Sequence, residues 1–366
     1  MEHILYWLWL TDAISFSKIK RLHKYFGNAE KIYEQSDYTD FPYLKAEDTL
    51  KLKDKSLDNA KLRYNLCLQK GIRIIVWDSH DYPPLLRHIS EPPLILYARG
   101  IIPDWRSIFT VGIVGTRSMT NYGREVTEKF ASGLINEGVT IVTGFAYGND
   151  ISATRLAVER GVFSIALLGG GVDVIYPRIH EQLYNKMVSC GLFLSEQPPG
   201  TPPYGYNFPK RNRILSGICR AVLITEAPEV SGAIITAHMA SDQGRDVFVV
   251  PGAINASSSK GANMLIQEGA YPVLDSRDII GKYPVFEERR KRKAEIQASP
   301  PEADKPPQPV TDAEGAILSA LEKRDMNTDD LSSETGMPMT ECNSCCLMLE
   351  ISGKIMRLPG NVYHKK

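Results

Sequence analysis

Short β-rich runs alternate with helical patterns between about residues 70 and 282, and this alternation constrains the fold most. The runs are Ile72–Trp77, Ile108–Val114, Thr140–Thr143, Ser164–Leu168, Leu192–Ser195, Ala221–Thr225, Val247–Val250 and Pro272–Leu274. Strands separated by helices pair in parallel, with the helices covering both faces of the sheet. We therefore expect an α/β protein with an extended Rossmann-like parallel sheet over residues 70–282. Ligands of such sheets bind outside the carboxyl ends of the strands.

Different patterns flank this region on both sides. Apolar residues at helical spacing predict a small all-α domain over residues 1–66, similar to a SAM or helix-hairpin-helix module. A charged, proline-rich linker is expected over residues 283–310. Its proline-rich stretch predicts an extended segment, and its basic run is read as a solvated helix end in preference to a phosphate contact. Three helical patterns followed by a strand, a turn and a second strand predict a winged-helix domain over residues 311–366.

The third helical pattern of that last domain, residues 340–350, would be the DNA-reading helix of a winged helix. It contains Glu341 and Glu350 and has no Lys or Arg. Reading helices enter the major groove with polar, preferably basic side chains. This composition therefore favours contact with protein over contact with duplex DNA.

Composition narrows the class of protein. The formal net charge is zero, so binding to nucleic acid must rest on local clusters of charge. Six scattered cysteines do not resemble a secreted disulfide framework, and they favour a reducing cytoplasm. The apolar start, residues 1–10, lacks a basic leader and a cleavage site. We read it as a buried helix, so no membrane contact is expected.

The segment Asn207–Arg213 concentrates side chains that can bind a ligand. It places an aromatic ring, an amide and three cations at the junction between a loop and a helix. Free N–H groups at a helix start favour anions, cations add full charges, and a ring offers a face to a base. This combination suits a polynucleotide backbone. The candidate residues are Phe208, Lys210, Arg211, Asn212 and Arg213.

Helical geometry suggests how these cations are used. Lys210 and Arg213 are three residues apart and can share a face, whereas Arg211 and Arg213 cannot. We expect one arginine to brace neighbouring loops and the others to face phosphate.

Glycine-rich turns follow several of the expected strands. Glycine lets backbone N–H groups approach a phosphate, and the following helix start favours negative charge. A tight turn that binds nothing is the alternative at each single position. Together the turns would line one edge of the sheet as an anion-binding pocket. The residues concerned are Gly115, Thr116, Arg117, Gly144, Gly170, Arg178, Ser231 and Gly232.

Signals for catalysis or cofactor binding are weak. The first turn is not G-x-G-x-x-G, and the second strand does not end in an acid, which argues against NAD. The histidines are dispersed, and Cys342, Cys345 and Cys346 lack a second pair of ligands, so buried thiols are favoured over zinc. We expect no metal and no cofactor. Glu196 and Glu226, read as the ends of neighbouring strands, leave an acid–base pair open.

The ordered set of motifs resembles the DNA-processing protein A (DprA, or Smf) family. The set includes Gly115-Thr116-Arg117, Thr143–Ala146, Leu168–Pro177, Ser195-Glu196, Phe208–Arg213, Ser231-Gly232 and Pro251-Gly252. Asp81–Leu86 and Pro92–Tyr97 resemble the family's lead-in to its Rossmann-type domain. The likeness covers nearly the whole chain. One position departs from the pattern, because Thr154 stands where the family usually has His.

This resemblance implies a bacterial, cytoplasmic, non-enzymatic protein without a cofactor. It implies a homodimer that binds single-stranded DNA, protects incoming strands and loads RecA recombinase in natural transformation. Carried over by position, the strand pocket would include Arg117, Arg178, Phe208, Lys210, Arg211 and Arg213.

A second reading is a nucleotide-processing enzyme similar to the nucleoside-monophosphate phosphoribohydrolases. Those enzymes have a glycine-rich loop with a nearby arginine and glutamate, and this chain lacks their Pro-Gly-Gly-x-Gly-Thr-x-x-Glu run. A third reading is an interaction scaffold with a vestigial pocket.

Overall fold

The computed structural model describes residues 1–298, 312–358 and 362–365. The chain divides into two compact units, Met1–Glu287 and Glu288–Lys366, and each is described by itself. Among the described helices, none combines the length and the apolar character that a membrane crossing requires.

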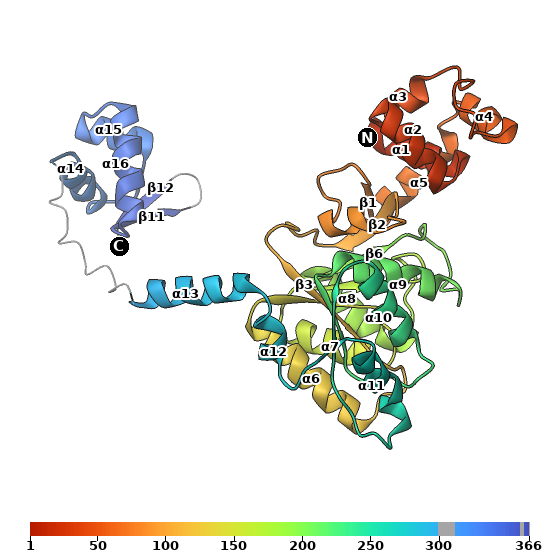
Figure 1. Ribbon diagram of the computed structural model, residues 1–366. Helices are drawn as coiled ribbons and strands as arrows, with labels where there is room; N and C mark the ends of the chain where they lie inside the picture. The colour runs from red at the N-terminus through yellow and green to blue at the C-terminus, as the bar shows by residue number, and fades with distance from the viewer. Residues whose placement is uncertain (299–311, 359–361, 366) are drawn as a thin grey trace. The chain divides into compact units, whose positions relative to one another are not determined.

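The first unit is built on a nine-stranded sheet with the order β1-β2-β6-β5-β4-β3-β7-β8-β9 (Figure 1). The strands are β1 (Arg73–Val76), β2 (Ile95–Gly100), β3 (Phe109–Val114), β4 (Val139–Thr143), β5 (Ser164–Leu167), β6 (Leu192–Ser195), β7 (Ala221–Ile224), β8 (Asp246–Val249) and β9 (Tyr271–Pro272). Every neighbouring pair from β6 to β9 is parallel. The Rossmann-like parallel sheet expected from the sequence is confirmed for this part.

The other edge of the sheet was not foreseen. Strand β2 was not predicted at all, and it runs antiparallel to both β1 and β6. Its residues lie in the proline-containing lead-in, where only one short 3-10 helix (Pro84–His88) separates β1 from β2. A chain that returns without a crossover helix pairs in antiparallel fashion.

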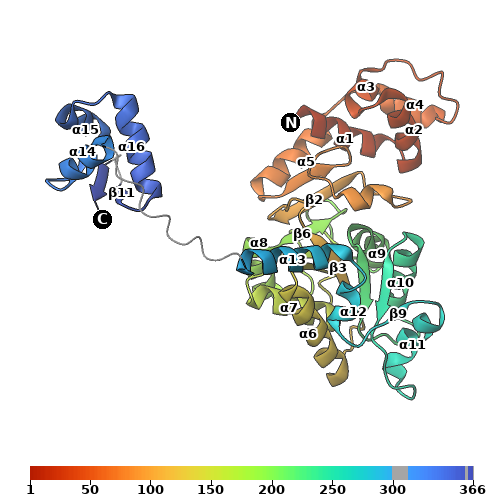
Figure 2. The ribbon, with the colours of Figure 1, turned by 60° about the vertical axis from the view of Figure 1, so that its left-hand side comes forward.

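Alternating side chains direct two hydrophobic layers to opposite faces of the sheet. Val142, Leu167 and Val222 pack against α9 (Asn207–Ile218) and α10 (Gly232–Asp242). Ile141 and Leu223 pack against α6 (Asn121–Asn136) and α7 (Asn149–Glu159) on the other face (Figure 2). The helix α8 (Glu181–Cys190) follows the short turn η2 (Arg178–His180), and η1 (Pro84–His88) packs beside α9.

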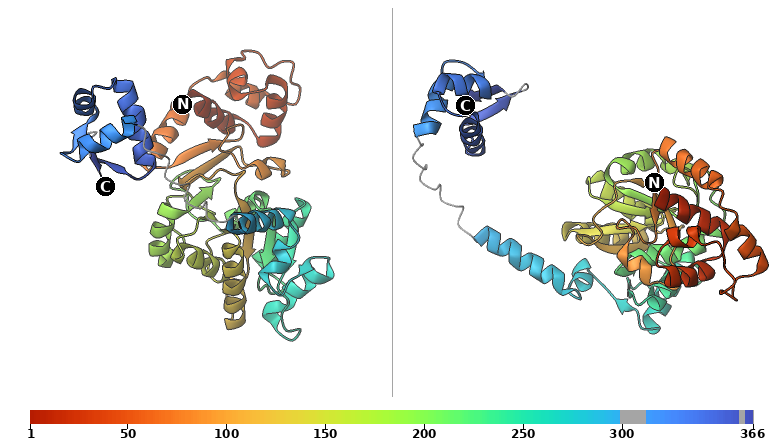
Figure 3. Two further views of the ribbon diagram at one scale, coloured as in Figure 1. Left: turned by 90° about the vertical axis from the view of Figure 1, so that its left-hand side faces the viewer. Right: turned by 90° about the horizontal axis from the view of Figure 1, so that it is seen from above.

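The N-terminal helices gather at the β1–β2 edge (Figure 3). They are α1 (Glu2–Ala13), α2 (Phe16–Phe26), α3 (Ala29–Glu34), α4 (Ala46–Lys53) and α5 (Asp58–Gln69). Gly27 ends α2 with a φ of 88°, which a residue with a side chain rarely adopts. The fully buried Trp7, Leu8 and Leu10 belong to the same hydrophobic core as Tyr97 and Phe193 of the sheet. The helical segment is therefore packed onto the sheet rather than tethered to it.

A helix occupies the start of the segment that was expected as a linker. After η3 (Ser257–Ser259), α11 (Lys260–Gln267) and α12 (Ser276–Ile280), the helix α13 spans Pro284–Ala298. Phe286 is buried against Phe109 at 4.8 Å between ring centroids. The charged run is therefore helical, in agreement with its reading as a helix end, and the buried Phe286 anchors the start of this helix in the core. Residues 299–311, with the proline-rich run, lie outside the described residues.

The second unit contains α14 (Asp312–Leu321), α15 (Thr328–Thr335) and α16 (Met339–Ile351). A small sheet accompanies them, with β10 (Met326–Asn327), β12 (Val362–Lys365) and β11 (Ile355–Leu358) in that spatial order. Ile317, Leu331, Cys346 and Leu349 form its core. This arrangement confirms the winged-helix prediction.

Candidate nucleic-acid interface

The glycine-rich turns and the start of α9 meet along the carboxyl ends of the parallel strands, an edge that we call the rim. At its centre Phe208 of α9 covers Gly169, where an added Cβ would lie 3.1 Å from the ring. The Arg117 guanidinium carbon lies 5.0 Å from the centre of the Phe208 ring, and the Tyr176 ring lies 5.8 Å from it. Turns from β3 and β5 are thereby joined to α9 by one ring. Only about 10 Å³ of cavity remains around Phe208, so the rim presents a surface and not a deep slot.

Cations are exposed along this surface. Arg117, Arg178 and Lys210 are all solvent-exposed. No carboxylate pairs with any of them within the part of the chain that the structure describes. Unpaired cations attract phosphate, and the half-buried ring of Phe208 beside Arg117 can contact a base.

The backbone donors of the turns are used differently from the expectation. The Glu226 carboxylate accepts from Thr120 N at 3.0 Å, at the start of α6. The Asp150 carboxylate accepts from Gly144 N at 2.9 Å, and that of Asp173 accepts from Gly200 N at 2.8 Å. At Gly144, one of the turn residues expected to face phosphate, the protein's own Asp150 thus accepts from the backbone donor.

The glycines have a packing role that the sequence did not reveal. A Cβ on Gly115 would lie 2.5 Å from the Asn149 side chain, and one on Gly144 would lie 2.6 Å from Arg211 Nη2. A Cβ on Gly170 would lie 2.8 Å from Thr201 O. These residues let protein atoms approach the turns. Phe145, in the second turn, has a φ of 54°, a strained value for a residue with a side chain.

Arg211 is the internal brace of the rim. It is buried, and its Nη1 donates to the Gly144 carbonyl at 2.8 Å and to the Leu167 carbonyl. Burial lowers the pKa of Arg211 to about 10. Burial also raises the pKa of Asp150 to about 6, against the attraction of Arg211. The pair ties the ends of β4 and β5 to α9, so Arg211 is not available to a phosphate.

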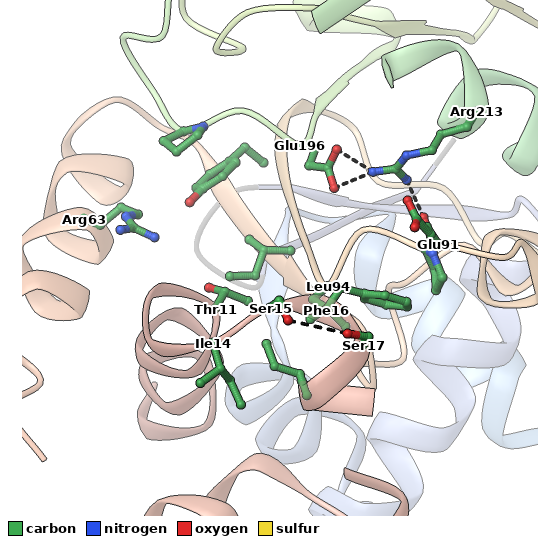
Figure 4. Close-up of a pocket in the computed structure, with 15 residues that line it drawn as sticks. Thr11, Ile14, Ser15, Phe16, Ser17, Arg63, Glu91, Leu94, Glu196 and Arg213 are labelled. Atoms are coloured by element: carbon green, nitrogen blue, oxygen red, sulfur yellow. Dashed lines mark hydrogen bonds and ion pairs between the residues drawn. The ribbon is translucent and has the colours of Figure 1, made fainter. Parts of the chain in front are cut away.

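Arg213 points into a separate cavity of about 460 Å³ between α2, the start of β2 and the end of β6 (Figure 4). Its Nη2 donates to both Glu196 carboxylate oxygens at 2.7 and 2.6 Å. Its Nη1 donates to the Glu91 carbonyl at 2.5 Å. Arg213 therefore does not face phosphate, contrary to the expectation from the sequence. Two arginines brace loops, where one was expected, because opposite sides of α9 face the sheet and the N-terminal helices.

The remaining candidates hold elements together. Thr116 is buried, and its N–H donates to the Glu226 carbonyl at 2.8 Å. Asn212 donates to the Gly232 carbonyl at 3.5 Å. Ser231 caps α10 by accepting from Ile234 N at 3.4 Å. Gly232 is exposed at the start of that helix.

Thr154, the position that departs from the family pattern, is buried in α7. Its hydroxyl lies 2.7 Å from that of Thr143 and donates to the Asp150 carbonyl at 2.9 Å. The side chain therefore joins α7 to the end of β4.

The proposed pair of catalytic acids is not formed. Strands β5, β4 and β3 lie between β6, which Glu196 follows, and β7, which Glu226 follows. The reading of these strands as neighbours was wrong, since the sequence does not reveal the spatial order of strands. Glu196 pairs with Arg213, and Glu226 accepts from the Thr120 hydroxyl at 2.7 Å.

The cysteines of α16 follow the sequence expectation in part. Cys342 and Cys346 are buried, and Cys345 is half-buried. Burial raises the pKa of Cys346 to about 11, which disfavours a thiolate. No three His, Cys, Asp or Glu side chains among the described residues are grouped to hold a metal ion.

Fold and site together define an α/β protein whose strand ends present cations and rings, followed by a winged helix. The family described as DNA recombination-mediator protein A matches residues 73–284, and the DprA winged helix domain matches residues 301–361. The chain belongs to the DprA/Smf family.

Individual relatives agree with this assignment. Protein Smf of Synechocystis is 34% identical over 81% of this chain and 81% of its own length. Protein Smf of Escherichia coli is 32% identical over 83% and 81%. The crystal structure of DprA from Streptococcus pneumoniae superposes with a TM-score of 0.67 at 30% identity, covering 75% of this chain and 96% of that one.

A second solved structure concerns the single-stranded DNA binding mode of DprA from Helicobacter pylori. It superposes with a TM-score of 0.52 at 28% identity, and it covers 57% of this chain and 95% of that chain.

Proposed function

We propose that this protein binds single-stranded DNA along the rim. The observation that carries the proposal is that Arg117 and Lys210 are exposed and lack carboxylate partners among the described residues, while each contacts a ring: Arg117 that of the half-buried Phe208, and Lys210 that of Tyr206. Stacked bases in a duplex have their faces covered, whereas an unpaired base can lie on a ring. Arg178, at the end of the third turn, extends the same positive surface. The structure of the Helicobacter pylori relative concerns binding of this kind.

The buried polar groups under the rim would act by holding the turns in place. Arg211 and Asp150 hold the second turn, and Glu226 holds the first turn, so that the exposed cations keep a fixed spacing. Pre-organised cations lose less conformational freedom on binding. In this proposal Gly115, Gly144 and Gly170 serve the site indirectly, by allowing those braces to pack.

The wider role that we propose is protection of incoming single strands and loading of RecA recombinase in natural transformation, by a cytoplasmic homodimer. Family membership and the family's description as a recombination mediator support this role. Catalysis and a cofactor are not part of the proposal.

A salt titration tests the binding step. Fluorescence anisotropy with labelled single-stranded and double-stranded oligonucleotides should show tighter binding to the single strand. Three phosphate contacts predict a slope of log K against log salt of about −2. The variant Arg117→Ala should lose affinity for all sequences alike.

A matched control removes the same charge elsewhere. Arg220 is exposed at the amino end of β7, opposite the rim, and Arg220→Ala should bind as the parent protein does. A flat salt response, or equal losses in both variants, would reject the rim as the binding surface.

A further inference from the structure

Two exposed tyrosine rings stack on each other beside the rim. The rings of Tyr204 and Tyr206 lie 5.5 Å apart with only 7° between their planes. They are 47% and 63% exposed, respectively. In the portion of the chain that the structure describes, Tyr206 is the only ring that stacks on Tyr204. The pair therefore leaves a large aromatic face open to a ligand.

Backbone hydrogen bonds hold this pair in place. Tyr204 N donates to the Pro202 carbonyl at 2.9 Å, and Asn207 N donates to the Tyr204 carbonyl at 3.0 Å. The same loop is tied to the third turn, since Gly171 N donates to the Thr201 carbonyl at 2.9 Å. Prolines at 202 and 203 restrict the backbone further. The rings are thus fixed relative to the rim before any ligand arrives.

A cation accompanies the rings. The Lys210 ammonium lies 5.6 Å from the centre of the Tyr206 ring, one helical turn away at the start of α9. Phe208 lies between them in sequence and faces Gly169 at the rim. Three rings and one cation thus lie within a short stretch of chain, and these are the groups that hold the bases and phosphates of a single strand.

We propose that Tyr204 and Tyr206 form a second platform for unpaired bases, next to the base that lies over Phe208. Lys210 contacts the phosphate between the two platforms. This inference rests on the proposed function and extends it, because it makes binding depend on strand length. Stacking tolerates any sequence, since every base has a π-face.

A length series separates this platform from the rim. Oligothymidylates of about 4 to about 16 nucleotides span the usual site sizes. The parent protein should gain affinity with length. The double variant Tyr204→Ser/Tyr206→Ser should bind the shortest strand normally and lose about tenfold on the longest. That loss equals about 1.4 kcal/mol, the scale of one stacked base.

Two controls identify the cause of the loss. Tyr204→Phe/Tyr206→Phe keeps both rings and should behave as the parent. Tyr25→Ser removes another exposed ring, 72% exposed on α2, and should have no effect. Equal melting temperatures will show that the variants are folded.

Abasic oligonucleotides complete the test. A long strand without bases outside its first few nucleotides should bind the parent and the Ser variant equally. The platform is refuted if the Ser variant gains affinity with strand length as the parent does. It is also refuted if the Ser variant binds more weakly than the parent by the same factor on abasic strands as on strands with bases. If even the parent fails to bind the shortest strand while the Tyr-dependent gain persists, the rim proposal fails and the platform does not. If the two rings instead bind a protein partner, the affinity for DNA will not depend on whether bases are present beyond the first few nucleotides. That result also refutes the platform.

Discussion

The rim and the helix α16 both occupy places where their folds contact nucleic acid, yet their side chains differ in kind. The rim exposes Arg117 beside Phe208 and Lys210 beside Tyr206, and Arg178 is exposed at the end of the third turn. The helix α16 exposes Leu347 and Met348, at 56% and 55%, and has two acids and no Lys or Arg. We therefore expect α16 to contribute less than the rim to DNA binding. The charge and the aromatic character of the exposed residues decide which of the two regions can hold a phosphate chain.

The regions also differ in what lies beneath their surfaces. Under the rim, the buried Arg211 and Asp150 fix the turns through hydrogen bonds to backbone groups. The core of the second unit consists of apolar residues and thiols. We therefore expect that replacing a single buried polar residue under the rim will disturb the turns.

The largest effect is expected from Arg211→Ala. The variant leaves the carbonyls of Gly144 and Leu167 without their donor and removes the cation beside Asp150. Breaking a buried charged network of this kind costs about 3–5 kcal/mol. Urea unfolding, followed by a signal specific to the first unit, should measure this loss. Arg178→Ala, at an exposed position, should stay within about 0.5 kcal/mol of the parent.

A pH-dependent effect of Asp150 should come next in size. Its pKa is raised from 3.8 to about 6 in the fold, so the native state holds this proton after the unfolded chain has lost it. Stability from this group is therefore greatest below about pH 4 and is lost as pH rises through 6, by at most about 3 kcal/mol. Asp150→Asn should flatten the difference in urea midpoints between pH 4 and 7. An unchanged pH profile in the variant would contradict this assignment.

Removing cations from the rim should weaken DNA binding without unfolding. The double variant Arg117→Ala/Lys210→Ala should lose about 1.4 in the salt slope, since each phosphate contact on a single strand contributes about 0.7. Substitution of Asn343, exposed on α16, by Ala should leave affinity and slope unchanged. Anisotropy titrations at several salt concentrations provide both values.

The smallest effect is expected from adding charge to α16. Glu341→Lys/Asn343→Lys places two cations on its exposed surface, and duplex affinity should rise a few-fold with a steeper salt dependence. Gel shifts with a random duplex would detect the gain. A large affinity of the parent protein for duplex DNA would instead contradict the prediction, made from residue composition, that α16 favours protein over DNA.

Much of the architecture could be predicted because hydrophobic periodicity and turn residues are local signals. The parallel strands and the helix α16 lie within a few residues of the sequence expectation. Strand β2 was missed because its place in the sheet depends on pairing with β6, a partner strand almost a hundred residues away, and no local pattern records that pairing. The separation of β6 and β7 in the sheet also depends on long-range pairing. The expectation that Glu196 and Glu226 lie at the ends of neighbouring strands was therefore wrong.

For the site, the sequence supplied the right residue types but not their orientation. Arg211, Arg213 and Lys210 belong to one motif, yet they are buried, paired with Glu196 and exposed, respectively. The rotation of α9 against the sheet sets these three environments, and it depends on packing that no local pattern records. Tyr204 and Tyr206 were overlooked because two tyrosines in a proline-rich loop carry no signal of stacking. Their spacing, with Lys210 four residues after Tyr206, was the available hint.

Hydrogen–deuterium exchange with and without a single-stranded oligonucleotide tests the central claim most directly. We predict slower exchange in the turns after β3, β4 and β5 and at the start of α9, and no change in α16. Protection confined to α16 or to the amino ends of the strands, with none at the rim, would contradict the claim that unpaired DNA lies over Phe208.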